Sequence, residues 1–195
     1  DALIHASARD GMRLGAAETR AFAHNDPQSA RAALRQWRAQ GGKGQVWLAV
    51  ESLYSMDGDF APLAELAALA AEEQAFLIVD EAHATGIWGP EGRGLAAPFA
   101  HLEQVVTLHT CGKALGVQGA LVCADPVLVD LLVNRARSFV YSTAPSPLLA
   151  EVLRRLHRLA LPAVVMAVRA HSAGYRERLA QVPPWLPALE RALLA

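Results

Sequence analysis

The 195-residue sequence lacks several features that would point to particular classes of protein. Its only two cysteines, Cys111 and Cys123, lie in apolar, strand-like surroundings, which favours reduced core thiols in a cytosolic protein over a disulfide framework. No apolar run reaches the roughly 18 residues needed to span a bilayer, and no signal peptide is evident. The net charge of -1 offers no basic field for nucleic acid or a membrane surface. We therefore expect a cytoplasmic protein without nucleic-acid or membrane partners.

Apolar residues, by contrast, are plentiful. They make up 53% of the chain, against 19% charged residues, which is enough for one domain with a substantial core. Short buried strands are expected to alternate with helices along most of the chain. The expected strands cover residues 1–5 (the end of a strand), 19–23, 45–50, 76–79, 105–108 and 120–124. The expected helices run to about 14, over 27–40, from 62, over 126–137 and over 147–160. This alternation predicts an α/β fold, a mainly parallel sheet with helices on both faces.

Polar residues gather where these strands end. In parallel sheets, ligands bind beyond the carboxyl ends of the strands. The strand-end candidates are His5, Asn25, 51–55, 80–83 and 110–113.

Lys113 follows one buried strand, in the stretch V-V-T-L-H-T-C-G-K-A-L-G. A lysine on a glycine turn just past a buried strand is partly desolvated, and desolvation lowers its pKa. Such an amine can attack a carbonyl and form a Schiff base. From this stretch alone, an ordinary surface lysine in a loop is the favoured interpretation.

The stretch L-I-V-D-E-A-H-A-T-G, ending at Gly86, fits two chemistries. Its Asp-Glu-Ala-His segment resembles the magnesium-binding segment of DEAH-type nucleotide hydrolases. That alternative needs an upstream G-x-x-x-x-G-K-[ST] loop, and the sequence has none. The second chemistry is pyridoxal phosphate, which needs a lysine for its aldehyde and a carboxylate against its ring nitrogen. Asp80 suits the carboxylate, His83 could bond the phenolic oxygen, and Thr110 could bond the phosphate. Each residue also has a structural interpretation, as a helix cap for Asp80 and a core histidine for His83.

Several motifs, in order, resemble the α-oxoamine synthases, which are pyridoxal phosphate enzymes of fold type I. The matching stretches are H-A-S at His5, F-A-H-N-D at Phe22, E-S-L-Y-S-M-D-G-D-F-A-P-L at Glu51, V-D-E-A-H-A-T-G at Val79, G-P-E-G-R-G at Gly89, T-C-G-K-A-L-G at Thr110 and Y-S-T at Tyr141. The resemblance covers roughly residues 1–160. It implies that residues 1–155 are part of the large cofactor-binding domain and that 156–195 begin the small C-terminal domain. It also implies a segment of a longer protein, cut at both ends.

The resemblance further implies a role for each candidate. Lys113 would hold the cofactor and move a proton, Asp80 would pair with the ring nitrogen, and His5 would stack on the ring. The remaining roles are contacts to the phenolic oxygen by His83 and Ser55, to the phosphate by Thr110, and to the phosphate of a neighbouring subunit by Thr143. Asn25 and Glu51 are weaker candidates.

The implied reaction is the decarboxylative condensation of L-alanine with pimeloyl-CoA or its acyl-carrier-protein equivalent, in a homodimer. Gly116–Ala120 lacks the paired glycines associated with 2-amino-3-ketobutyrate ligase and 5-aminolevulinate synthase, and Ala82 and Thr85 point the same way. These residues favour the branch of the family that serves biotin biosynthesis. Another member of the family, or an inactive fragment, remains an alternative.

Overall fold

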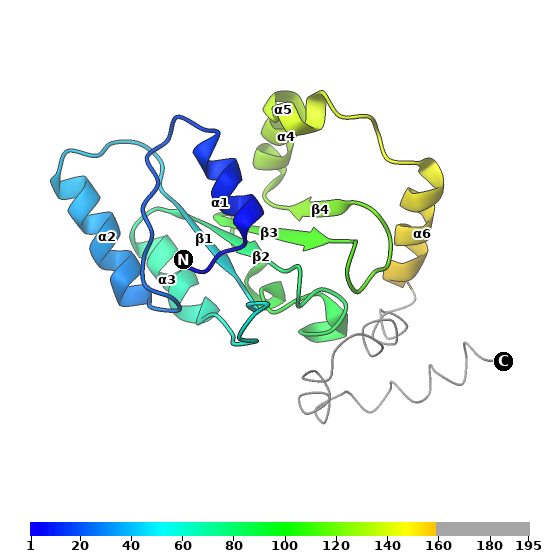
Figure 1. Cartoon of the computed structure of the whole chain (residues 1–195), viewed down its shortest axis with the longest axis horizontal. Helices are drawn as coiled ribbons and strands as arrows, with labels where there is room; N and C mark the ends of the chain where they lie inside the picture. Colours follow the sequence, from blue (N-terminus) through cyan, green and yellow to red (C-terminus); the bar gives the residue numbers. More distant parts are fainter. Residues whose placement is uncertain (159–195) are drawn as a thin grey trace.

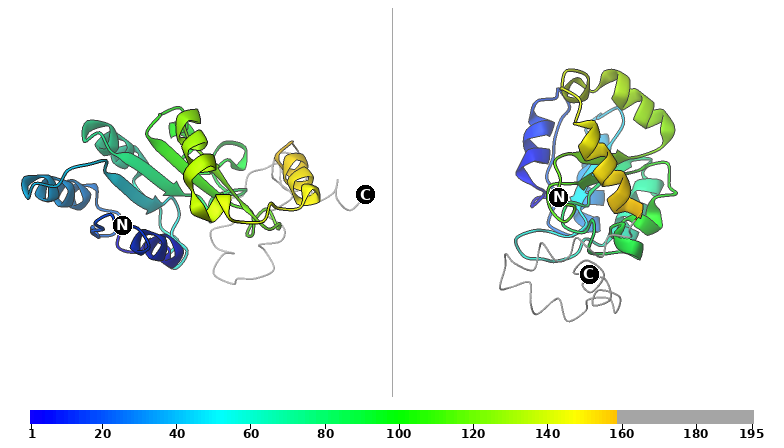
Figure 2. Two further views of the ribbon diagram at one scale, coloured as in Figure 1. Left: turned by 90° about the horizontal axis from the view of Figure 1, so that it is seen from above. Right: turned by 90° about the vertical axis from the view of Figure 1, so that its right-hand side faces the viewer.

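The computed structural model describes residues 1–158, which form a sheet of four strands with helices around it (Figure 1). The strands are β1 (Trp47–Glu51), β2 (Phe76–Asp80), β3 (Val105–Thr110) and β4 (Ala120–Cys123). The α-helices are α1 (Ala6–Arg13), α2 (Pro27–Ala39), α3 (Leu63–Glu72), α4 (Pro126–Arg135), α5 (Arg137–Val140) and α6 (Pro147–Arg158). Two 3-10 helices, η1 (Pro90–Gly92) and η2 (Ala97–Phe99), lie between β2 and β3. Figure 2 shows α1 and α3 on opposite sides of the sheet.

The sheet has the order β1-β2-β3-β4, and its first three strands are parallel. Glu51, the last residue of β1, is in register with Asp80, the last residue of β2. The strand β4 is antiparallel to β3 and pairs Ala120 with Thr110. The carboxyl ends of the three parallel strands therefore meet at one edge, and this confirms the mainly parallel α/β fold.

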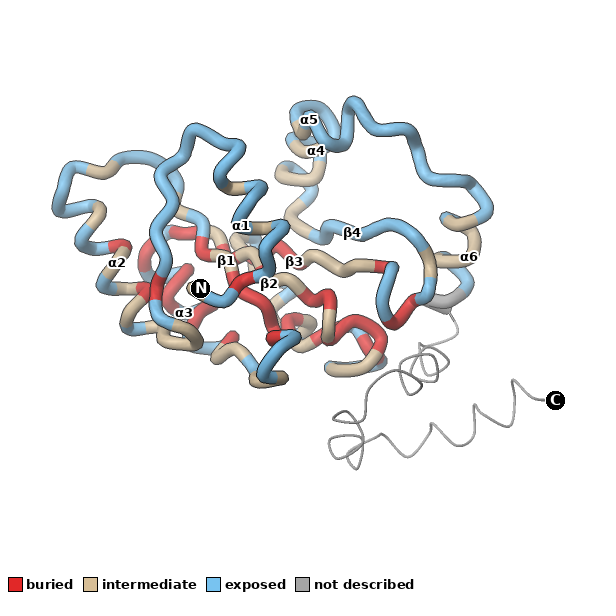
Figure 3. Tube along the Cα trace, in the orientation of Figure 1, coloured by how far each residue is buried: buried red, intermediate tan, exposed pale blue. Residues whose placement is uncertain are grey.

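The core lies between β1, β2 and the helix α3 (Figure 3). Leu66 and Leu69 on α3 and Val50, Leu77 and Val79 on the strands are each at most 1% exposed. In contrast, every residue of β4 is exposed. Buried residues alternate with half-buried ones along β2, and β1 is similar apart from the exposed Trp47. The strand β4 forms an uncovered edge of the sheet in the part of the chain that the structure describes.

The helix starts follow from local chemistry. The carboxylate of Asp26 accepts hydrogen bonds from the backbone N–H groups of Gln28 and Ser29, and Pro27 occupies the first turn, where no intrahelical donor is needed. Asp125 caps α4 in the same way, ahead of Pro126. The predicted start of each of these two helices is confirmed.

Three predictions about local structure are wrong. Residues 19–23 are not a strand, because Phe22 makes a single backbone bond, from the N–H of Ala2, in place of a ladder. Residues 1–5 form a turn rather than the end of a strand. Cys123 is exposed on β4, although Cys111 is buried as expected, and both thiols are free. The predicted domain boundary at 155 stays a prediction, because most of 156–195 lies outside the described residues.

Within residues 1–158, no helix is both long and apolar enough to cross a membrane.

Candidate functional site

The candidate site lies at the edge where the parallel strands end. Glu51 and Asp80 terminate β1 and β2, and β3 delivers Thr110 and then the turn that holds Lys113. This turn is closed by backbone hydrogen bonds, including one from the N–H of Gly116 to the carbonyl of Lys113.

Buried apolar residues on both sides of Lys113 anchor that turn. Cys111, Ala114 and Leu115 are 0%, 3% and 9% exposed and form a small core cluster of their own. Between them, Lys113 is exposed as a residue, although its amine is partly desolvated. The turn is therefore fixed by packing, while the lysine projects from it.

The amine of Lys113 lies against the imidazole of His83. Lys113 Nζ and His83 Nε2 are 2.6 Å apart. Burial lowers the pKa of Lys113, while the charges of Asp80 and Glu51 act in the opposite direction. Burial and the charge of Lys113 also lower the pKa of His83. A hydrogen bond between two nitrogens needs a lone pair on one of them, and both shifts favour the deprotonated state that supplies it.

Two carboxyl groups stand next to this pair. The Oδ1 atom of Asp80 accepts a hydrogen bond of 2.9 Å from the N–H of Ala82, so the residue does cap the following turn. Glu51 is 3% exposed. Burial and then the charge of Asp80 raise the pKa of Glu51, against a backbone hydrogen bond from His5 and the charges of His5 and Lys113. Glu51 is therefore a member of the site, closer to its centre than its weak standing in the sequence suggested.

The structure thus brings together Lys113, His83 and Asp80, and the charges of His5 and Lys113 both act on the pKa of Glu51. His5 is exposed, caps α1 and shares a 2.8 Å hydrogen bond between its Nδ1 atom and Ser7 Oγ.

Three predicted residues lie further out. Ser55 is in the exposed turn after β1, Thr110 is half-buried at the end of β3, and Thr143 is in the exposed connection between α5 and α6. The contacts predicted for these three, and the cofactor roles of the central four, stay predictions.

Sequence reasoning missed Glu81, which is 0% exposed. Its carboxylate accepts hydrogen bonds from Ser52 Oγ at 2.7 Å, from the N–H of Leu95 at 3.0 Å and from the N–H of Ala96. Burial raises its pKa. The signal in the sequence is Gly94, where a Cβ would lie 2.6 Å from the Glu81 carboxyl carbon.

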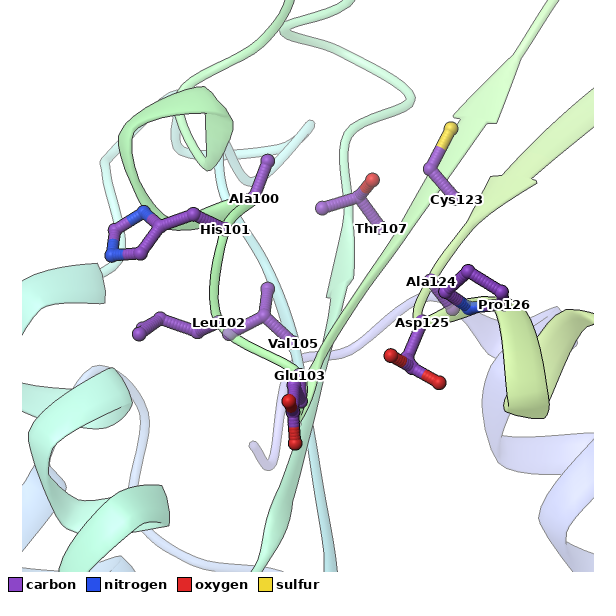
Figure 4. A pocket seen from close by; sticks show the side chains of 10 residues that line it. All are labelled: Ala100, His101, Leu102, Glu103, Val105, Thr107, Cys123, Ala124, Asp125 and Pro126. Carbon is purple, nitrogen blue, oxygen red and sulfur yellow. The ribbon is translucent and has the colours of Figure 1, made fainter.

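A cavity of about 280 Å³ lies elsewhere, between the start of β3 and the end of β4 (Figure 4). It is lined by Ala100, His101, Leu102, Glu103, Val105, Thr107, Cys123, Ala124, Asp125 and Pro126. None of the predicted site residues lines this cavity. The reactive side chains at the opposite ends of the strands, rather than this cavity, therefore define the candidate site. The described residues hold no group of three or more side chains arranged to bind a metal ion.

The sequence and the fold of this chain are both similar to those of known proteins. Residues 1–188 match the family model "Aminotransferase class I and II". The chain belongs to this family, which places the Asp80 segment in an aminotransferase fold rather than in the nucleotide hydrolase considered above.

Among its relatives are enzymes named 8-amino-7-oxononanoate synthase. The protein of this name from Acidithiobacillus ferrooxidans is 44% identical over 95% of this chain and 48% of its own length. The one from Burkholderia cenocepacia is 41% identical over 91% of this chain and 44% of its own length. The chain therefore spans about half the length of the curated relatives it matches.

Solved structures of the same fold include two related enzymes. Serine palmitoyltransferase of Sphingomonas wittichii superposes with a TM-score of 0.72 at 29% identity, over 80% of this chain and 39% of that one. The 8-amino-7-oxononanoate synthase of Francisella tularensis gives a TM-score of 0.62 at 31% identity, over 81% of this chain and 45% of that one.

Proposed function

We propose that this chain forms the lysine-bearing part of a pyridoxal-phosphate-dependent acyltransferase. The reaction joins L-alanine to pimeloyl-CoA, or to the pimeloyl thioester of an acyl carrier protein, and yields 8-amino-7-oxononanoate for biotin synthesis. Carbon dioxide and the free thiol are released, so the atoms balance. The observation that carries the proposal is the 2.6 Å contact between Lys113 Nζ and His83 Nε2, beside Asp80.

The residues present fit this cofactor. Lys113 offers an amine whose pKa is lowered by burial, as attack on an aldehyde requires. Asp80 offers a carboxylate at a strand end, and His83 offers a ring nitrogen on the same side as the lysine. Pyridoxal phosphate, when bound, supplies an electron sink for the carbanion at the substrate's α-carbon.

The chain's own groups divide the remaining work. With the cofactor and amino acid bound, Lys113 Nζ would be the base that takes the α-proton, because its lowered pKa leaves it unprotonated more readily than an ordinary lysine. His83 Nε2 lies within hydrogen-bonding distance of that amine and orients it. Asp80 would hold a proton on the ring nitrogen of the cofactor, and Glu51, which is 3% exposed, would add a second carboxyl group near Asp80 and His5.

The outer candidates complete the proposal. Ser55 bonds the phenolic oxygen, Thr110 binds the phosphate, and Thr143 reaches the phosphate site of a second subunit in a cytoplasmic homodimer. We infer these roles from the motifs and from the position of Ser55 and Thr110 at the same sheet edge. A large-domain assignment for residues 1–155 belongs to the same proposal.

The substrate pair is the part of the proposal that activity measurements test. The protein, loaded with pyridoxal phosphate, is given L-alanine with pimeloyl-CoA, L-serine with palmitoyl-CoA, or glycine with acetyl-CoA or succinyl-CoA. We expect release of free thiol and formation of 8-amino-7-oxononanoate, identified by mass, with the first pair only. The relatives of that name, which are 44% and 41% identical to this chain, support this choice.

Two other outcomes would be informative. Turnover of serine or glycine in preference to alanine would assign the chain to another α-oxoamine synthase. Cofactor binding without turnover of any pair would show that these 195 residues hold the lysine site but not a complete enzyme.

A further inference from the structure

A second polar cluster, which we call the His24 clamp, lies beside the candidate site and has no part in the proposed chemistry. It consists of Asp1, His24, Asn25 and Asp59. These residues come from three separate segments: the one that leads to His5, the loop before α2, and the turn after β1.

His24 is the centre of the clamp. Its Nδ1 atom lies 2.9 Å from Asp1 Oδ1, and its Nε2 atom lies 2.7 Å from Asp59 Oδ2. The ring of Tyr54 packs edge-to-face against the imidazole of His24, with the two ring centroids 4.4 Å apart. Both ring nitrogens therefore face carboxylate oxygens, and Nε2 also lies 3.3 Å from Asn25 Nδ2.

Each contact to a carboxylate oxygen calls for a hydrogen on the ring nitrogen. An ionised carboxylate can only accept hydrogen bonds, and a neutral imidazole can donate only one. Two contacts of this length to two carboxylates are both satisfied when His24 is an imidazolium, and charge-assisted bonds of this kind are stronger than neutral ones. The side chain of Asp1 is 0% exposed, so solvent does not compete for it.

The remaining bonds of the clamp tie down backbone. Asp1 also accepts from the N–H groups of Leu3 and Asn25, both at 2.8 Å. Asn25, which has a positive φ of 52°, donates from Nδ2 to Asp59 Oδ2 at 2.6 Å. The clamp thus restrains the segment two residues before His5.

Asp59 links the clamp to the turn after β1. Its carbonyl accepts from the N–H of Tyr54 at 3.0 Å, and the N–H of Gly58 donates to the carbonyl of Tyr54 at 2.9 Å. Ser55 lies inside this turn. One imidazolium therefore joins the segment of His5 to the turn of Ser55, two groups proposed to face the cofactor from different parts of the chain.

We propose that His24 is a positioning residue, an imidazolium bridge between Asp1 and Asp59 that sets His5 and Ser55 at the cofactor site. The inference rests on the proposed function for the identity of the ligand. The protonated state of the bridge does not depend on it.

The first test measures pyridoxal phosphate affinity of the full chain by absorbance titration, for the unchanged protein, His24→Ala and Asp59→Asn. His24→Ala removes the bridge, and Asp59→Asn removes the charge of one of its two carboxylates without changing side-chain size. We expect affinity to fall about tenfold in each, which is the effect of losing one charge-assisted hydrogen bond. Lys113 should still be the residue fixed to the cofactor by borohydride, because the turn that holds it is packed separately.

Glu73→Gln is the matched control. Glu73 is a carboxylate 8% exposed that pairs with Arg31, Arg35 and Arg38, and it ties α2 to the end of α3 away from the site. This variant should lose stability but keep the affinity of the unchanged protein. If the two clamp variants bind within twofold of Glu73→Gln, the positioning role is refuted.

The second test needs no cofactor. Nitrogen-15 NMR of the imidazole should show protons on both ring nitrogens of His24 at neutral pH, and loss of that state in Asp59→Asn. A neutral ring with a single tautomer would overturn the bridge. Failure of the unchanged protein to bind pyridoxal phosphate would instead refute the proposed function, and the NMR result would still decide the state of the bridge.

Discussion

Replacing Glu81 with glutamine should destabilise the protein far more than a surface charge change does. The carboxylate of Glu81 is fully buried and accepts from three donors: Ser52 Oγ, the N–H of Leu95 and the N–H of Ala96. A glutamine keeps one acceptor oxygen but turns an NH₂ group toward at least one of those donors. One buried donor left unpaired costs about 1–3 kcal/mol, so we expect a loss of about 2 kcal/mol in the free energy of unfolding.

The pH dependence of this loss has a definite sign. Burial raises the pKa of Glu81 in the folded protein above its value of 4.5 in the unfolded chain. The stability contributed by this raised pKa is fully present below 4.5 and is lost as the pH rises through the folded-state pKa. Glutamine does not titrate. The deficit of Glu81→Gln relative to the unchanged protein should therefore be larger at about pH 5 than at about pH 8.

Urea unfolding followed by circular dichroism at the two pH values measures this deficit. Glu91→Gln is the control, because the Glu91 side chain is 73% exposed and its 3.6 Å pair with Arg93 lies on the surface. Such a pair contributes about 0–1 kcal/mol. Two results would refute this account of Glu81: a loss of unfolding free energy in Glu81→Gln no larger than that of the control, or a loss that grows from the lower to the higher pH.

Three further predictions concern other parts of the chain. Because burial lowers the pKa of Lys113, more of its amine is unprotonated at a given pH. Acetic anhydride below about pH 9 should therefore label Lys113 faster than Lys43, as measured by peptide mass, and slower labelling of Lys113 would contradict this. Asp26→Ala removes the cap of α2 and should cost about 1 kcal/mol in urea unfolding, and an unchanged midpoint would show that the cap is unimportant. Gly94→Ala places a Cβ 2.6 Å from the Glu81 carboxyl carbon at a φ of 92°, so it should melt well below the unchanged protein, and equal melting would mean that this loop adapts freely.

The sequence predicts the centre of the candidate site well because parallel strands bring their ends together. Asp80 and Lys113 each follow a buried apolar run, and once these runs lie side by side the two residues must share an edge. The helix starts at Pro27 and Pro126 are equally local, since a cap and a proline settle them within a few residues. These are features in which short-range sequence and long-range structure agree.

The features missed depend on contacts that no local pattern encodes. Residues 19–23 have the composition of a strand, but no neighbouring strand pairs with them in the described part of the chain. Glu81 looks like an ordinary acidic residue until a loop 15 positions later returns to place the N–H of Ala96 against it. His24 bridges partners 23 and 35 positions away, so its role emerges only from the fold.

The attachment of the cofactor tests the central claim most directly. The sequence contains only two lysines, Lys43 and Lys113, so the site of covalent attachment can be decided by peptide mass alone. The protein is incubated with pyridoxal phosphate, reduced with borohydride and digested, in parallel with Lys113→Ala and Lys43→Ala. We predict a visible absorbance band that reduction removes, with the added mass on Lys113 in the unchanged protein and in Lys43→Ala, and no fixed cofactor in Lys113→Ala. Folded protein without such a band, or one that carries the added mass on Lys43, would contradict the assignment.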